Sequence, residues 1–232
     1  MSQLPLAIEV DFFDRFLETD ISVFEWVQKL QQTAAEPVLT FILKVLTYLG
    51  EGGILFLAFA IGLLLTKKYK KAGLAVLGAL GIMVILNNVV LKSLFARPRP
   101  FNLYEDGRMD IIRDQYAWWA QRYTYPDIVS RPQSLSFPSG HSSSAFCAAF
   151  AGAFASKKFK IALPMFILAA LVAFSRIYVE VHYFTDVAFG ALVGFIYGIL
   201  GTLLVWFIWK KWGDKIDAFI EKAKAAVLRK KA

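Results

Sequence analysis

The sequence Phe137-Pro138-Ser139-Gly140-His141 is followed by an apolar run of small residues, 142–155. The run predicts a helix with a serine, a glycine and a histidine at its start. A helix N-terminus presents free N–H groups and the positive end of the helix dipole, and a glycine lets a ligand approach closely. His141 adds a group that carries a proton near neutral pH. The stretch therefore predicts a phosphate-handling anion site at the start of a buried helix.

The composition indicates a membrane protein. Of the 232 residues, 57% are hydrophobic, and the mean hydropathy is +0.52, whereas soluble domains are about 45–50% apolar. Runs with almost no charge lie at 53–66, 73–91, 142–156, 161–174 and 187–209. Several approach the roughly 20 residues that a helix needs to cross a bilayer. The prediction is an all-α, polytopic membrane protein embedded in the bilayer.

The net charge of +8 raises the question of a nucleic-acid partner. The lysines, however, gather in three places, at 67–71, at 157–160 and from 210 through the tail. If the spans alternate, these clusters share one side of the membrane, which is the positive-inside pattern of a cytoplasmic face. We therefore expect no nucleic-acid partner. Cys147 is the only cysteine, which excludes an intrachain disulfide and a cysteine-based metal site.

Three regions follow from this pattern. Residues 1–35 are expected to form an interfacial or cytoplasmic segment with an amphipathic helix at 6–32. Residues 36–210 are expected to form the membrane domain, and 211–232 a basic cytoplasmic tail. Six spans are predicted, at 38–49, 54–66, 73–94, 139–155, 161–176 and 182–209, with a sharp corner at 50–53 between the first two. Gly190, Gly194 and Gly198 predict a close helix-packing face.

A long loop, 101–137, separates the third and fourth spans. Its 116–125 stretch carries five aromatic residues, Tyr116, Trp118, Trp119, Tyr123 and Tyr125, which suit either an interfacial belt or a lid over substrate. Because lysine clusters follow the second, fourth and sixth spans, both termini are expected in the cytoplasm and this loop outside it. The stretches 92–101, 137–141 and 175–186 then meet at the extracytoplasmic face of the plasma membrane.

These three stretches contain cations suited to phosphate. Lys92, Arg99 and Arg176 could neutralise the equatorial oxygens of a phosphoryl group, and arginine binds phosphate with two parallel hydrogen bonds. Taken singly, Lys92 and Arg176 could instead anchor span ends at the membrane surface, and Arg97 is expected to do so. Asn87 and Asn88 are expected to join helices rather than to bind a ligand.

The remaining groups predict acid–base and nucleophilic chemistry. His182 and Asp186 are four residues apart, so on a helix the carboxylate lies beside the imidazole and can fix its tautomer. His182 is then the expected nucleophile, forming a phosphohistidine, and His141 the expected acid and base. The Ser139 hydroxyl and the Gly140 N–H would stabilise the transition state. No carboxylate cluster has two-metal spacing, so no metal or cofactor is expected.

Together the three motifs resemble the signature of the type 2 phosphatidic acid phosphatase superfamily. This family comprises integral-membrane lipid phosphatases that share their site with soluble bacterial acid phosphatases and vanadium haloperoxidases. The resemblance extends over roughly 36–210 and implies a six-helix membrane core. It also implies site roles for eight residues: His182 as nucleophile, His141 as acid and base, Asp186 as partner, and Lys92, Arg99, Ser139, Gly140 and Arg176 as phosphate ligands.

The expected function is hydrolysis of a lipid phosphate or diphosphate at the extracytoplasmic face. Undecaprenyl diphosphate is the first choice of substrate, followed by phosphatidylglycerol phosphate and phosphatidate. A water-soluble ester is less favoured, and haloperoxidase activity less again. The alternative is a non-catalytic membrane protein that binds or translocates a lipid phosphate. The sequence leaves open the physiological lipid, the choice between mono- and diphosphate, and the oligomeric state.

Overall fold

The computed structural model describes residues 6–66, 68–105, 126 and 128–229, and this part of the chain is helical without a strand. The all-α prediction is confirmed. The elements are α1 (Leu6–Gln31), α2 (Glu36–Leu49), η1 (Glu51–Gly53), α3 (Ile54–Leu65), α4 (Lys70–Met83), η2 (Val84–Leu91), α5 (Lys92–Phe95), α6 (Pro100–Glu105), α8 (Gly140–Ser156), α9 (Phe159–Tyr178) and α10 (Phe184–Arg229).

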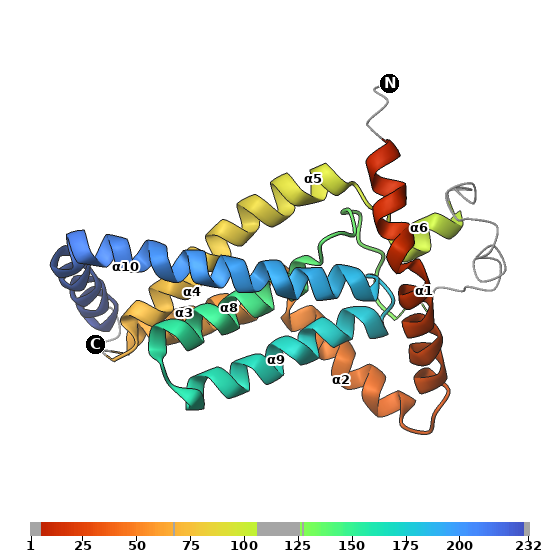
Figure 1. Cartoon of the computed structure of the whole chain (residues 1–232). Coiled ribbons are helices and arrows are strands. Elements are labelled where there is room, and N and C mark those ends of the chain that lie inside the picture. The colour runs from red at the N-terminus through yellow and green to blue at the C-terminus, as the bar shows by residue number, and fades with distance from the viewer. Residues whose placement is uncertain (1–5, 67, 106–125, 127, 230–232) are drawn as a thin grey trace.

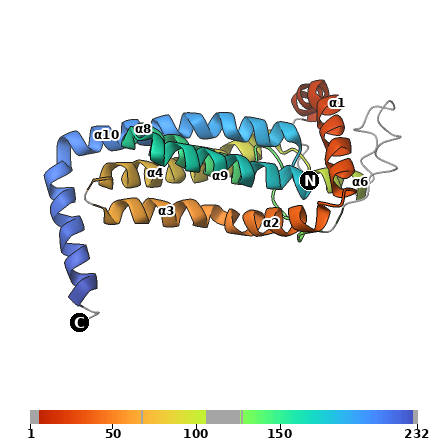
Figure 2. The same cartoon turned by 90° about the horizontal axis from the view of Figure 1, so that it is seen from below.

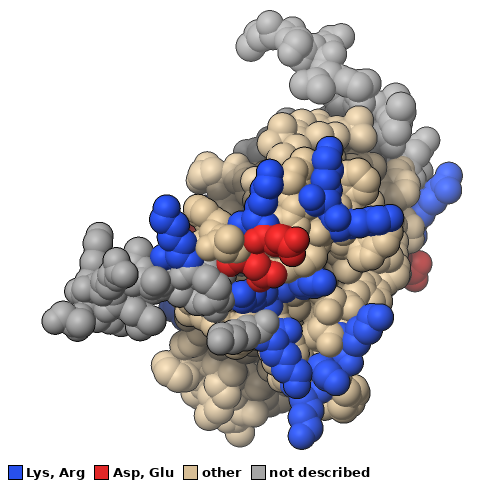
Figure 3. Space-filling view, turned by 90° about the vertical axis from the view of Figure 1, so that its left-hand side faces the viewer, with Lys and Arg blue, Asp and Glu red and all other residues tan. Residues whose placement is uncertain are grey.

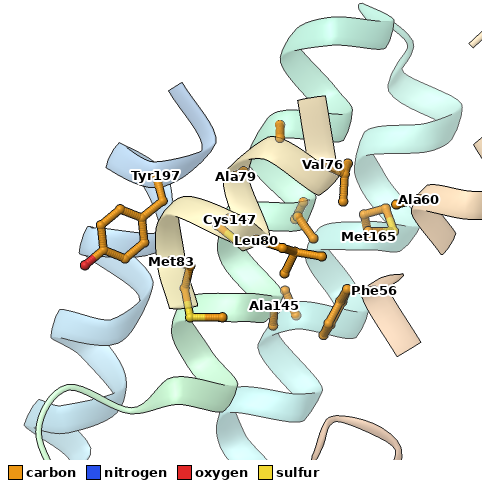
Figure 4. Close-up of a cluster of buried hydrophobic side chains, with 14 of the residues drawn as sticks. Phe56, Ala60, Val76, Ala79, Leu80, Met83, Ala145, Cys147, Met165 and Tyr197 are labelled. Carbon is orange, nitrogen blue, oxygen red and sulfur yellow. The ribbon is translucent and has the colours of Figure 1, made fainter. Parts of the chain in front are cut away.

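Helix α8 is the centre of an elongated bundle, with α4, α9 and α10 packed around it (Figures 1 and 2). Its small side chains let these neighbours approach, and Ala145, Ala148 and Ala151 are fully buried. Figure 4 shows the adjoining apolar core, to which α3 contributes Phe56 and α9 contributes Met165. The apolar run that follows the Phe-Pro-Ser-Gly-His stretch therefore forms the core helix of the fold.

The glycine row on α10 faces the backbone of α8. A Cβ at Gly190 would lie 2.9 Å from the Ser139 carbonyl oxygen, and one at Gly194 would lie 2.8 Å from the Ser143 carbonyl oxygen. Both distances are shorter than ordinary van der Waals contact, so only glycine allows this helix separation. The predicted close-packing face is confirmed.

Within the described residues, three helical stretches have the length and hydropathy of membrane spans, and a bent helix pair makes up to four. The three stretches are Lys70–Asn102, Phe159–Tyr178 and Phe184–Phe219, and the bent pair is formed by α2 and η1–α3. The protein is thus an integral membrane protein by its helices. The corner expected at 50–53 is a bend of 53°, at which Gly52 and Gly53 have φ values of +59° and +72°. The two spans predicted on either side of this corner lie here in one bent path, because the two glycines bend the chain without reversing it, and the count of six spans stays a prediction.

The two ends of the bundle carry different elements. Helix α1 lies across one end of the bundle, and the loops that hold the lysine clusters lie at the other, where α10 kinks at Trp212 (Figures 1 and 2). Figure 3 shows this second end crowded with Lys and Arg side chains. Helix α1 and the kink of α10 thus lie at opposite ends of the bundle, and the cytoplasmic location of both termini stays a prediction. The amphipathic helix itself is confirmed, with Leu17, Phe24 and Val27 on its buried face.

Candidate active site

A cavity of about 540 Å³ lies where α2, η2, α8 and α9 meet. It is bounded by the α2–α3 break, by η2, by the start of α8 and by the end of α9. Six of the eight predicted site residues line it: Lys92, Arg99, Gly140, His141, Arg176 and His182. Asp186 and Ser139 are fully buried and lie behind this lining. Segments up to about 90 residues apart in sequence therefore meet around one cavity, as the convergence of the three motifs predicts.

Arg99 orients the imidazole of His182. Its Nη1 lies 3.2 Å from His182 Nε2 and also donates to the Val181 carbonyl at 2.7 Å. Arginine can only donate hydrogen bonds, so Nε2 must accept and the ring proton must lie on Nδ1. The Nε2 lone pair is therefore directed at a buried guanidinium in the cavity lining.

Asp186 holds the opposite edge of the same ring. Its Oδ2 lies 3.3 Å from His182 Nδ1 and accepts from the Tyr183 N–H at 3.0 Å and from the Ser136 hydroxyl. Burial, and then the positive charge of Arg99, lower the pKa of His182 well below its usual value, although Asp186 acts in the opposite direction. The ring is consequently neutral at pH 7, with Nε2 unprotonated and facing Arg99.

His141 and Arg176 are both held by Thr47, at the C-terminal end of α2. His141 Nε2 lies 3.2 Å from the Thr47 carbonyl oxygen and donates to it, since a carbonyl can only accept. Arg176 Nη1 donates to Thr47 Oγ1 at 3.2 Å, and this hydroxyl is 2.7 Å from Ser175 Oγ. With Nε2–H committed to Thr47, His141 keeps Nδ1 for proton exchange. Nothing in the local sequence distinguishes Thr47 from other helical threonines.

The residues just before the Phe-Pro-Ser-Gly-His stretch position the first motif. Lys92 Nζ donates to the Leu135 carbonyl at 2.7 Å, and Arg99 Nε donates to the Ser134 carbonyl at 2.6 Å. Ser136 is fully buried and bonds Asp186. Sequence reasoning missed Ser134 and Ser136, although two serines directly ahead of a predicted anion site were a usable signal. The five loop aromatics lie outside the described residues.

The predicted phosphate ligands of α8 differ in their placement. Gly140 lines the cavity, whereas the Ser139 hydroxyl caps the helix by accepting from the Ser142 N–H at 3.4 Å. The Ser139 N–H donates to the Asp186 carbonyl at 3.0 Å, which ties the second motif to the third. Asn87 joins η2 to α8, as expected, because its Oδ1 accepts from Ser143 Oγ at 2.8 Å.

Arg97 does not anchor the membrane surface, and that expectation is wrong. The residue is 5% exposed, and its guanidinium bonds Asp186 and Asp20. Two buried carboxylates pair with the guanidinium of Arg97, so this side chain points into the fold and not toward the membrane surface. Among the described residues, no group of three or more His, Cys, Asp and Glu side chains could hold a metal ion.

A bundle of membrane-spanning helices that surrounds two histidines and three cations defines a membrane protein with an internal site for an anion. The chain belongs to the PAP2 superfamily, whose family profile matches residues 72–211. It is 28% identical over 123 residues to undecaprenyl-diphosphatase BcrC of Bacillus subtilis (strain 168), in a match that spans only 53% of each chain.

Two solved structures are similar over most of their length. A transmembrane PAP2-type phosphatidylglycerolphosphate phosphatase from Bacillus subtilis superposes with a TM-score of 0.61 and 24% identity, over 85% of this chain and 90% of that one. Aquifex aeolicus LpxE superposes with a TM-score of 0.53 and 27% identity, over 78% and 93%. The membership inferred from the three motifs is thus confirmed, and the helical arrangement is shared.

Proposed function

We propose that this protein is a lipid phosphatase that hydrolyses a lipid phosphate or diphosphate through a phosphohistidine on His182. The observation that carries the proposal is the state of the His182 ring. Its Nδ1 proton is held by Asp186, and its Nε2 faces Arg99 in the cavity at 3.2 Å. A neutral imidazole beside a buried guanidinium is a nucleophile placed where a phosphate would bind.

The first step forms one bond and breaks another. His182 Nε2 attacks phosphorus as the bond from phosphorus to the leaving oxygen breaks, and protonated His141 gives that oxygen a proton. Asp186 stabilises the imidazolium that forms. Lys92, Arg99 and Arg176 all belong to the cavity lining, and in the proposal they neutralise the equatorial oxygens.

The second step restores the protein. Water attacks the phosphohistidine, the bond between phosphorus and Nε2 breaks, and neutral His141 takes the proton of the water. Inorganic phosphate leaves, and both histidines return to their starting states. The leaving group is a lipid alcohol for a monophosphate and a lipid monophosphate for a diphosphate. In this proposal the protein's cations stabilise the charge, so the reaction proceeds without a metal ion.

The cavity's apolar border supports a lipid substrate. The apolar side chains Tyr48 of α2 and Val84 of η2 line the cavity and are 48% and 50% exposed, so the cavity border has accessible apolar surface. A lipid could place its phosphate inside while its chain stays against this surface. The basic loops at the far end favour an extracytoplasmic site under the positive-inside rule.

Undecaprenyl diphosphate is the first substrate to test, because the curated relative is an undecaprenyl-diphosphatase. Phosphatidylglycerol phosphate, phosphatidate and a soluble phosphate ester complete the panel. Phosphate release by purified protein in EDTA is measured for each substrate with wild type, His182→Ala and Lys158→Ala. Lys158 is exposed at the far end of the bundle, so its variant serves as the control.

We expect wild type and Lys158→Ala to release phosphate from at least one lipid and His182→Ala to release none. Equal release by His182→Ala would overturn the phosphohistidine mechanism. Lipid binding without release by the wild type would favour the alternative, a non-catalytic protein that binds or translocates the lipid.

A further inference from the structure

The carboxylate that orients His182 is itself held by an arginine that lines no part of the cavity. Arg97 Nη1 donates to Asp186 Oδ1 at 2.6 Å, and its Nη2 donates to Asp20 Oδ2 at 2.8 Å. The three side chains are at most 5% exposed. A continuous chain of charged hydrogen bonds therefore runs from α1 through Arg97 to Asp186 and His182.

Asp20 is fixed as firmly as Asp186. Its Oδ1 accepts from the Thr185 N–H at 2.9 Å, and its Oδ2 accepts from the Thr185 hydroxyl at 2.7 Å as well as from Arg97. The Arg97 guanidinium lies between the rings of Tyr183 and Phe13, at 3.7 and 4.2 Å from their centroids. Arg97 thus has one position, set by ring stacking on both faces and a carboxylate at each end.

The geometry divides the oxygens of Asp186 between two partners. Because Nη2 is committed to Asp20, Arg97 reaches Asp186 through Nη1 alone and engages Oδ1. This leaves Oδ2 for His182 Nδ1 and the Ser136 hydroxyl. An arginine without Asp20 could turn to form the paired, two-oxygen contact that guanidinium and carboxylate groups favour, and would then compete with His182 for Oδ2.

We propose that Asp20 is a positioning residue for the His182–Asp186 pair and acts through Arg97. The inference rests on the proposed function. Asp20 lies outside the 72–211 region matched by the family profile, so α1 takes part in catalysis as well as packing on the bundle. Burying charged groups is energetically costly, and a buried ion pair is weak evidence for a gain in stability. A role in orienting Asp186 explains why the Asp20–Arg97 pair is buried.

The test compares Asp20→Asn with a matched variant of the same helix. Asparagine keeps the size of the side chain and an oxygen for the Thr185 N–H, and Arg97 stays paired with Asp186. We expect kcat to fall about tenfold to a hundredfold, by analogy with groups that orient metal-bound histidines through a hydrogen bond. KM should change by less than about twofold, because the cavity lining is intact.

Gln31→Ala provides the matched control. Gln31 docks α1 on the bundle through a 2.8 Å hydrogen bond from its Nε2 to the Tyr178 carbonyl, and that contact is separate from Arg97. If Asp20 only docked the helix, Asp20→Asn and Gln31→Ala would both lower the unfolding temperature, and their kcat values would be the same. The proposal predicts a kcat loss for Asp20→Asn only.

A double-mutant cycle with Arg97→Lys tests the route. Lysine keeps the charge but cannot bridge two carboxylates with a planar fork, so Arg97→Lys should lower kcat by itself. In that background Asp20→Asn should cost less than about twofold further, since coupled residues are not additive. Independent, multiplying losses would overturn the proposal.

The outcomes distinguish a failure of the proposed phosphatase activity from a failure of the positioning role of Asp20. An inactive wild type would refute the proposed phosphatase, whereas an active wild type with an equally active Asp20→Asn would refute only the positioning role. If Asp20→Asn does not fold, the kcat of Arg97→Lys is the deciding measurement. An unchanged kcat in Arg97→Lys would overturn the proposal.

Discussion

The close contact between Gly190 of α10 and the start of α8 predicts how strongly a substitution there lowers kcat. In Gly190→Ala the new Cβ would lie 2.9 Å from the Ser139 carbonyl oxygen, where ordinary contact begins at 3.4 Å. The backbone of α8 or α10 must therefore move by about 0.5 Å, the difference between these two distances. A functional group tolerates a displacement of roughly 0.5 Å, and about 1 Å can cost a hundredfold in rate. We therefore expect kcat to fall about tenfold.

Gly198→Ala is the control for this prediction. Its Cβ would lie 2.7 Å from Phe150 Cβ, an overlap at least as severe. Phe150 is nine residues beyond His141 along α8, or about 13 Å at the helical rise. Both variants should lose about 1–3 kcal/mol of stability by overpacking, but Gly198→Ala should keep its kcat.

The assay combines thermal unfolding in detergent with phosphate release at saturating lipid. A Gly190→Ala protein that loses stability and keeps wild-type kcat would refute the claim that Ser139 and its helix start position the site. Equal kcat losses in the two variants would point to general loosening of the bundle instead.

Further predictions concern the chemistry. For wild type, kcat/KM should fall on acidification only below pH 6.5, because the pKa of His182 is lowered and its neutral form persists there; a midpoint above 6.5, after correction for substrate ionisation measured by ³¹P NMR, would contradict this. EDTA should leave kcat unchanged, and restoration of lost activity by added divalent metal would contradict the metal-free mechanism. Ser136→Ala, which removes a donor to Asp186 Oδ2, should lower kcat about three- to thirtyfold and stability by about 1–3 kcal/mol; unchanged steady-state kinetics would count against that hydrogen bond. Arg176→Lys should raise KM more than it lowers kcat, since lysine cannot bind phosphate with a fork, and a titration of activity against lipid checks the split.

Much of the candidate site was visible in the sequence because its groups occur in short motifs. The four-residue spacing predicted the contact of His182 with Asp186, although His182 lies just ahead of α10 and not on it as expected. The alternation of spans predicted that three motifs would meet. These inferences need only local geometry and the sidedness of lysines. Six of the eight residues do line one cavity.

The missed residues act through long-range contacts. Asp20 meets Thr185 across 165 positions, and Thr47 meets Arg176 across 129. No local pattern distinguishes an aspartate on an amphipathic helix that pairs with a buried arginine from one that faces water. Arg97 was misjudged for the same reason, since its partners lie on elements far away in the chain.

The count of six spans stays a prediction for a different physical reason. Apolar runs on both sides of a glycine corner fit a hairpin and a bent helix equally well. The direction of the chain after Gly53 depends on the backbone angles of two glycines, which composition does not specify.

The bent path formed by 36–65 makes a prediction about membrane topology that fusions can test. Helix α1 lies at one end of the bundle, and the kink of α10 lies at the other, lysine-rich end. If this path crosses the bilayer once, a reporter domain joined ahead of α1 is expected in the compartment opposite to that of a reporter joined after α10. A pair of such fusions would report different environments from one polypeptide.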